Sequence, residues 1–368
     1  GFLNLPGGAG VTADPLYRWK VIGVAATALI VLSLPAWVIR NGRGAVTHPQ
    51  ADDAPTFVGR EACRPCHQAA FDSWIGSDHD LAMAPADDES VLGDFADATF
   101  TSKGITSRFF KRGGSYFVNT QGPDGEPADF EITHTFGHDP LQQYLVPFPG
   151  GRLQCLSIAW DSVREEWFDL YPDQEIPPDD WLHWTRAAQN WNGMCAECHS
   201  TNLRKGFDAS SNGYKTTWSE IDVSCEACHG PGSRHVQWAE VQPMARPAID
   251  DYGLVVPTGG ISSRQQVELC APCHSRRTEL GDYDHSSAAL LHSHLPSVLD
   301  EGLYHADGQI LDEVYVWGSF TQSKMFANDV RCSDCHDVHS LKLKFDGNDL
   351  CLQCHRADAY DTREHHFH

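Results

Sequence analysis

Basic residues are scarce in this chain. It has 27 Lys and Arg against 50 Asp and Glu in 368 residues, which gives a formal net charge of -23. A protein that binds nucleic acids without sequence preference needs a basic surface that displaces counterions from the phosphates. This charge balance therefore excludes DNA and RNA as expected partners.

Charge is absent from one long apolar run, which extends from Val21 to Ile39. At a rise of about 1.5 Å per residue a helix of this length measures about 28 Å, close to the hydrocarbon thickness of a bilayer. A cleaved signal peptide is the alternative, but residues 40–44 (RNGRG) form a poor cleavage site. We therefore predict one membrane-spanning helix within an anchor at residues 1–44.

Cysteine, by contrast, is abundant, and twelve of the 13 cysteines belong to one repeated motif. Cys-x-x-Cys-His occurs six times, and these motifs are numbered 1 to 6 along the chain. The cysteines and histidine of successive motifs are Cys63, Cys66 and His67; Cys195, Cys198 and His199; Cys225, Cys228 and His229; Cys270, Cys273 and His274; Cys332, Cys335 and His336; and Cys351, Cys354 and His355. This repetition excludes an ordinary disulfide scaffold.

The histidine after each cysteine pair decides between cofactors. Zinc sites and redox dithiols use cysteines at the same spacing but do not require a following histidine. Covalent c-type haem does require it, because the thiols form thioethers and the adjacent imidazole becomes the proximal iron ligand. We therefore predict six covalently bound c-type haems. The remaining cysteine, Cys155, is predicted to be a small buried hydrophobe on a strand.

The haem motifs also predict the compartment. Covalent attachment of c-type haem takes place outside the cytoplasmic membrane, so the large C-terminal part is expected in the periplasm or an equivalent space. The flanking charges do not set this orientation, because Arg18 and Lys20 oppose Arg40 and Arg43. Expected partners are the cytoplasmic membrane, through residues 21–39, and redox proteins.

Methionine is scarce, which limits the choice of sixth iron ligand. Four methionines cannot serve every iron, so bis-histidine ligation is expected, and it implies lower reduction potentials than histidine–methionine ligation. We predict six distal ligands among the histidines outside the motifs: His79, His183, His235, His305, His339 and His366. A ligand role and a surface or hydrogen-bonded role remain equally open for His134, His138, His285, His292 and His294.

Local spacing supports several of these ligands. His79 follows motif 1 across a helix-like stretch, and His235 follows motif 3 through a turn at residues 230–233 that directs it toward a neighbouring haem. His339 lies just after motif 5, and its expected iron is that of motif 6. No Cys-x-x-Cys-Lys occurs, so the lysine-ligated signature of a pentahaem nitrite reductase is absent.

Motif spacing predicts the domain organisation. Residues 45–97 form a linker and the first haem site, residues 98–175 form a haem-free β-rich subdomain with a hairpin around Gly113 and Gly114, and residues 176–368 hold motifs 2 to 6. Little chain is available for each haem, so neighbouring haems are expected to lie close together. We predict a multihaem cytochrome c fold, mostly α-helical and irregular around six haems, with a β-rich insert and one N-terminal transmembrane helix.

Beyond the motifs, the sequence resembles a family of bacterial multihaem c-type cytochromes, many of which carry tetratricopeptide repeats after the haem region. The resemblance covers most of residues 57–368. It rests on TFGHDPLQQYL (135–145), PGGRLQ (149–154), QNWNGMCAECHSTNL (189–203), VSCEACHGPGSRHVQWA (223–239), DGQILDEVYVWGSF (307–320) and CSDCHDVHS (332–340).

The resemblance implies a periplasmic electron-transfer role. It also matches His235 and His339 to the distal-type histidines of paired haem motifs. Similar chains tend to continue past residues 365–368 into further motifs and helical repeats, so we expect either a short form or a longer native chain. The resemblance does not by itself imply a membrane anchor.

Together these observations predict a membrane-anchored hexahaem cytochrome that relays electrons between membrane redox components and other carriers. One alternative is an oxidoreductase that acts on a nitrogen or sulfur oxyanion at a five-coordinate haem. Another is a subunit of a conducting filament or of a larger membrane complex. Electron transfer is favoured over catalysis, because the residues identified position and tune haems rather than make bonds.

Overall fold

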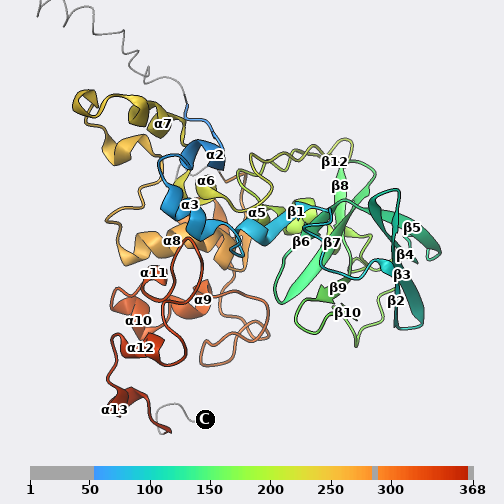
Figure 1. Ribbon diagram of the computed structural model, residues 1–368. Coiled ribbons are helices and arrows are strands. Elements are labelled where there is room, and N and C mark those ends of the chain that lie inside the picture. The colour runs from blue at the N-terminus through green and yellow to red at the C-terminus, as the bar shows by residue number, and fades with distance from the viewer. Residues whose placement is uncertain (1–53, 284–288, 364–368) are drawn as a thin grey trace, which may run out of the picture. The chain divides into compact units, whose positions relative to one another are not determined.

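The computed structural model describes residues 54–283 and 289–363 (Figure 1). By its internal contacts the chain divides into two units, residues 1–54 and residues 55–368. The description that follows concerns the second unit, which contains all six motifs.

Some of the predicted features lie outside the described residues. These are the membrane-spanning segment at residues 21–39 and the histidines His285 and His366. Within the two described ranges, no helix combines the length and the apolar character needed to cross a bilayer.

Short helices surround the motifs. They are α2 (Arg60–Cys63), α3 (Gln68–Trp74), α4 (Trp191–Met194), α5 (Ala196–His199), α6 (Cys225–His229), α7 (Ser233–Glu240), α8 (Ser263–His274), α9 (Trp317–Phe320), α10 (Lys324–Ala327), α11 (Cys332–Cys335), α12 (Asp349–Leu352) and α13 (Ala357–Tyr360). The longest described helix is α8, with 12 residues, and the next is α7, with 8. Helices this short are not stable alone, so tertiary contacts must hold them.

Between motifs 1 and 2 the chain is mostly β-structure, drawn in cyan to green in Figure 1. A four-stranded antiparallel sheet has the order β2 (Ala96–Ser102), β3 (Ile105–Arg112), β4 (Ser115–Gln121) and β5 (Pro127–Ile132). A six-stranded sheet has the order β1 (Met83–Pro85), β6 (His134–Phe136), β7 (Leu141–Phe148), β9 (Ile158–Asp161) and β10 (Glu166–Asp169), with β8 (Arg152–Cys155) paired to β7. Two small hairpins follow, β11 (Phe207–Asp208) with β12 (Gly213–Tyr214) and β13 (Arg277–Glu279) with β14 (His294–Pro296).

The predicted hairpin is confirmed. Strands β3 and β4 pair antiparallel with Arg112 opposite Ser115, and the intervening Gly113 and Gly114 have φ values of 61° and 90°. Such values favour glycine, because a side chain would clash with the backbone. The β-structure begins before the expected boundary at residue 98, since β1 and the first residues of β2 precede it.

An aromatic core fills the β-rich part. Alternate residues of β4 point inward, so Tyr116, Val118 and Thr120 are buried. Phe109 is fully buried, and its ring stacks on Trp167 with 3.6 Å between centroids. The buried members of this cluster include no motif residue, so the chain itself provides this core.

A second cluster connects the sheets to motif 2. Its buried residues include Met83, Leu145, Cys155, Trp191 and Ala196. Cys155 lies in β8 with 2 % of its surface exposed, which confirms the prediction of a buried strand residue. Burial raises the pKa of this thiol well above its ordinary value, which makes it unreactive.

The region around motifs 5 and 6 is different. After Gly318 none of the described residues is buried. Helices α10, α11, α12 and α13 accordingly contribute no buried side chain. The described chain therefore provides no hydrophobic core of its own around these two motifs.

The aromatic core yields a stability prediction. We expect Phe109→Ala to lower the free energy of unfolding by about 3–5 kcal/mol, because it removes a buried ring and leaves a cavity. Denaturant unfolding, monitored by the circular dichroism signal of β-structure, measures this loss. Val163→Ala is the control, since that side chain is 71 % exposed. Equal stability of the two variants would show that the β-rich part does not depend on this core.

Candidate haem-binding sites

Each motif is built on a helical turn. In motif 1 the N–H of His67 donates to the carbonyl oxygen of Cys63 at 3.0 Å, and in motif 5 His336 donates to Cys332 at 3.0 Å. Residues three and four positions apart lie on one side of such a turn, so both thiols and the imidazole project together. All 13 cysteines are free thiols. Two thiols and one imidazole are the donor set that covalent c-type haem requires.

Thiols from different motifs contact one another. The hydrogen-bonded pairs are Cys63–Cys225, Cys198–Cys273 and Cys270–Cys332. Contacts between helices support the first two of these thiol pairs, since α2 packs on α6 and α5 packs on α8. Motif 6 lies beside motif 5, because the Gln353 amide donates to the carbonyl oxygen of Asp334 at 3.4 Å. Motif 1 is therefore next to motif 3, and motifs 2, 4, 5 and 6 follow one another.

The thiol pairs are electrostatically asymmetric. The hydrogen bond with Cys63 lowers the pKa of Cys225 to about 7, and the hydrogen bond with Cys270 lowers the pKa of Cys332 to about 7. Each contact therefore links the protonation of thiols that belong to two different motifs.

Two pairs of imidazoles join distant parts of the chain. The rings of His67 and His235 have centroids 6.0 Å apart, and those of His79 and His274 are 6.2 Å apart. Each pair combines the histidine of one motif with a predicted distal histidine. A histidine nitrogen lies about 2 Å from a metal that it ligates, so imidazoles on opposite sides of one metal have centroids about 6 Å apart. Both pairs fit this spacing.

Backbone carbonyls orient several imidazoles, including that of His336, whose Nδ1 atom lies 3.1 Å from the carbonyl oxygen of Leu341. The Nδ1 atom of His235 lies 3.0 Å from the carbonyl oxygen of Tyr252, and that of His199 lies 3.2 Å from the carbonyl oxygen of Ala82. A hydrogen bond at Nδ1 fixes the tautomer and leaves Nε2 free to bind a metal. His235 and His199 are therefore prepared as ligands by the chain.

His79 has the protonation state that a ligand needs. Burial, and then the charges of His274 and His199, lower the pKa of His79 to about 4. The ring is thus neutral near neutral pH, and neutral imidazole is the form that binds metals.

His339 interacts with a motif that is distant in sequence. Burial and then the charge of His339 lower the pKa of His229 in motif 3, while its expected role at the iron of motif 6 stays a prediction. A tight turn follows motif 5. The carboxylate of Asp337 accepts the N–H groups of His339 at 3.1 Å and Ser340 at 2.8 Å, which folds this segment back.

No contact described for His183 or His305 involves a motif histidine. His183 is buried in the β-rich part, where its Nδ1 atom lies 2.9 Å from Thr185 Oγ1 and its ring lies beside Trp184. His305 is exposed and bonds the backbone of Gln309. The described structure thus favours a packing role for His183.

Sequence reasoning did not identify a charged cluster at motif 2. Glu197, inside the motif, accepts from Arg277 at 2.6 Å and lies 3.1 Å from Nε2 of His294. Burial alone would raise the pKa of Glu197, but hydrogen bonding with His294 and attraction to Arg277 lower it to about 2. Burial, and then the hydrogen bond with Glu197, raise the pKa of Glu279 to about 7. The Ser293 hydroxyl lies 2.8 Å from Nδ1 of His294. Both ring nitrogens of His294 thus have hydrogen-bond partners, which favours a structural role over iron ligation.

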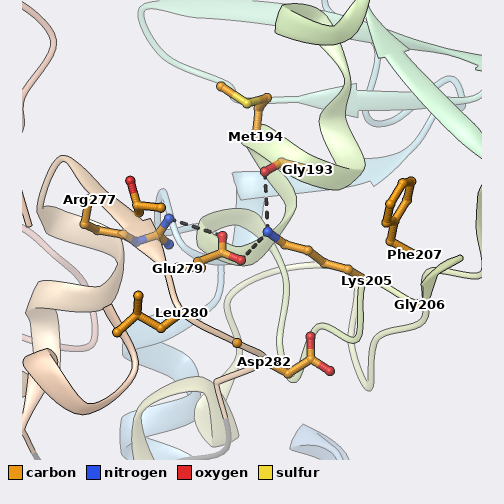
Figure 2. A pocket seen from close by; sticks show the side chains of 11 residues that line it. Gly193, Met194, Lys205, Gly206, Phe207, Arg277, Glu279, Leu280 and Asp282 are labelled. Carbon is orange, nitrogen blue, oxygen red and sulfur yellow. Dashed lines mark hydrogen bonds and ion pairs between the residues drawn. The ribbon is translucent and has the colours of Figure 1, made fainter. Parts of the chain in front are cut away.

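A cavity of about 690 Å³ lies beside this cluster (Figure 2). Its lining includes Met194, Lys205, Arg277, Glu279 and Asp282. Figure 2 shows that Glu279 lies between the two cations, forming an ion pair with Lys205 and another with Arg277 at 3.3 Å. Both cations that line the cavity are thus paired with carboxylates, which disfavours an anionic ligand.

A second unpredicted cluster holds motif 1 in place. Arg60, the first residue of α2, donates to Glu220 at 2.7 Å and to Asp222 at 2.7 Å. Burial raises the pKa of Asp222 to about 6 although the charge of Arg60 opposes this shift. Arg60 and Glu220 are 160 positions apart, so no local pattern could reveal the contact.

Two family models match parts of the chain. Residues 182–230, which contain motifs 2 and 3, match the family described as cytochrome c554 and c-prime. Residues 324–360, which contain motifs 5 and 6, match the family described as a doubled CXXCH motif. A comparison with curated proteins gave no significant match.

Solved structures provide the fold comparison. The outer cell wall cytochrome OcwA matches with a TM-score of 0.53 and 16 % identity over 82 % of this chain and 68 % of that chain. An undecahaem cytochrome from the S-layer of Carboxydothermus ferrireducens matches with a TM-score of 0.43 and 17 % identity over 84 % of this chain and 44 % of that chain. At these identities the likeness concerns the fold. The six motifs, the two family matches and the fold of OcwA agree, and each makes this chain similar to multihaem c-type cytochromes.

Proposed function

We propose that the chain binds six c-type haems, one at each motif, and relays electrons among them. The observation that carries this proposal is the contact between motifs. Thiols of motifs 1 and 3, of motifs 2 and 4, and of motifs 4 and 5 are hydrogen-bonded, and motif 6 contacts motif 5. His339 brings motif 5 to motif 3. Every motif thus has another motif as a direct neighbour, which is the arrangement that a relay requires.

The proposal includes three distal ligands. His235 completes the iron site of motif 1 and His79 that of motif 4, because both pairs have the ring spacing expected across a metal. His339 completes the site of motif 3, and the effect of its charge on His229 supports this assignment. When bound, the haems supply one-electron chemistry, while the chain positions the ligands and sets their environment.

The proposed location is the outer face of the cytoplasmic membrane. Thioether attachment outside that membrane supports it, and the apolar run at residues 21–39 would serve as the anchor. The proposed partners are membrane redox components and other electron carriers. Haem staining of separated membrane and soluble fractions tests the anchorage.

The ligand assignment predicts a change of spin state. We expect His235→Ala to convert one low-spin haem to the high-spin form, because its iron loses a strong-field imidazole. Electron paramagnetic resonance of the oxidised protein measures the change, and His79→Ala should convert a different haem. His183→Ala is the matched control and should leave every iron as in the parent. A His235→Ala spectrum identical to that of the parent would contradict the assignment.

The proposed relay function leads to a prediction about the number of haems in the full chain and their reversible reduction. We expect mass spectrometry to find one haem on each motif, and replacement of Cys351 and Cys354 by serine to remove a single haem. Reductive titration should then reduce all haems reversibly, since every motif has a neighbouring motif with which its haem can exchange electrons. A high-spin iron in the parent that binds nitrite or hydroxylamine would instead support the alternative of an oxyanion-reducing enzyme.

A further inference from the structure

Glu226 is a buried carboxylate inside a haem motif. It occupies the first variable position of motif 3, directly after Cys225, and only 2 % of its surface is exposed. Removing a charged group from water is costly unless hydrogen bonds replace the lost hydration. The contacts of Glu226 therefore indicate what its burial achieves.

Backbone N–H groups satisfy both carboxylate oxygens. Val58 donates to each oxygen at 3.0 Å, Gly59 donates to Oε2 at 2.8 Å, and Gly232 donates to Oε1 at 2.7 Å. Gly59 has a φ of 80°, a value that favours glycine, so the chain bends to present its N–H. These donors are neutral peptide groups, so they stabilise the anion without cancelling its charge.

The three donors belong to two different parts of the fold. Val58 and Gly59 immediately precede α2, the helix that begins motif 1, while Gly232 precedes α7, the helix that carries His235. The ring of His235 is in turn 6.0 Å from that of His67 in motif 1. One carboxylate therefore joins motif 1, motif 3 and the helix that presents the proposed distal ligand.

The carboxylate of Glu226 also places a negative charge beside the proposed haem sites of motifs 1 and 3. The thiols of Cys63 and Cys225 are hydrogen-bonded, and Glu226 follows Cys225 directly. Within a protein, charges interact more strongly than in water because the local dielectric constant is lower. A fixed anion stabilises ferric iron relative to ferrous iron, because the ferric site carries one more positive charge.

We propose that Glu226 lowers the reduction potentials of the haems bound at motifs 1 and 3, while it holds His235 in position. This inference rests on the proposed haem binding at those two motifs. Burial, hydrogen bonding and charge act together here, since the backbone N–H groups replace water around a carboxylate whose field is little screened at this buried position. Glu226 is thus a positioning and tuning residue rather than an iron ligand.

The test is Glu226→Gln in the full haem-loaded chain. Glutamine keeps the size of the side chain and removes its charge. We expect at least one haem potential to move to a more positive value in a potentiometric titration, with haem content unchanged. A titration curve that superimposes on that of the parent would overturn the proposal.

Glu61→Gln is the matched control. Glu61 lies in α2, also beside motif 1, but its side chain is 72 % exposed. Water and salt screen a charge at that position, so the same substitution should leave the potentials unchanged. An equal shift in both variants would show that burial of Glu226 has no special effect.

Glu226→Asp separates charge from position. It keeps the anion but shortens the side chain, so we expect potentials close to those of the parent and an altered paramagnetic signal from the iron that His235 ligates. A positive shift as large as that of the glutamine variant would overturn the tuning role. If the glutamine variant does not assemble, the aspartate variant still tests the positioning role, because an unchanged paramagnetic signal would overturn it.

Peptide mass spectrometry distinguishes the two levels of inference. A parent protein without haem on motifs 1 and 3 would overturn the proposed function. Unchanged potentials in a fully loaded Glu226→Gln variant would overturn only the role of Glu226.

Discussion

The arrangement of the helical region depends on imidazoles that meet from distant parts of the chain. His67 meets His235, whereas His79, only a short distance after His67, meets His274. The segment that follows motif 1 must therefore reach motif 4 while motif 1 itself stays beside motif 3. Helices of four to twelve residues cannot maintain such positions alone, so Arg60 and Glu226 add long-range polar contacts around motif 1.

The chain combines two sources of stability. The β-rich part has a closely packed aromatic core around Phe109 and Trp167, which the polypeptide provides by itself. The described residues after Gly318 have no buried side chain, although this region contains motifs 5 and 6. In the proposed haem-loaded form, apolar macrocycles would supply the missing core there. Folding of this region would then depend on haem attachment, because the covalently held macrocycles would supply the apolar surface that the chain itself lacks.

Local features of this protein could be predicted from the sequence, and long-range features could not. The six motifs, the hairpin at Gly113 and Gly114 and the buried Cys155 depend on neighbouring residues or on residue type. The turn residues after motif 3 indicated that His235 faces another motif, but its partner depends on how segments far apart in sequence come together.

The histidine predictions show the same limit. His183 has tryptophan neighbours like those expected around a haem, yet Trp184 belongs to the aromatic core of the β-rich part. His339 lies next to motif 5 in sequence, yet its charge affects the pKa of His229 in motif 3, an interaction that spacing along the chain does not indicate. Arg60 and Glu226 have partners more than 150 positions away, so no periodicity or spacing could reveal their roles.

The crossing of the two imidazole pairs also constrains how the protein is made. If the chain leaves the cytoplasm from its N-terminus, motif 1 emerges long before His235 and before the segment that carries His274. The pair of His67 and His235 can then close only after residue 235 has crossed the membrane, and the pair of His79 and His274 only after residue 274 has crossed. Motif 1 would thus wait for a segment that emerges after motif 3.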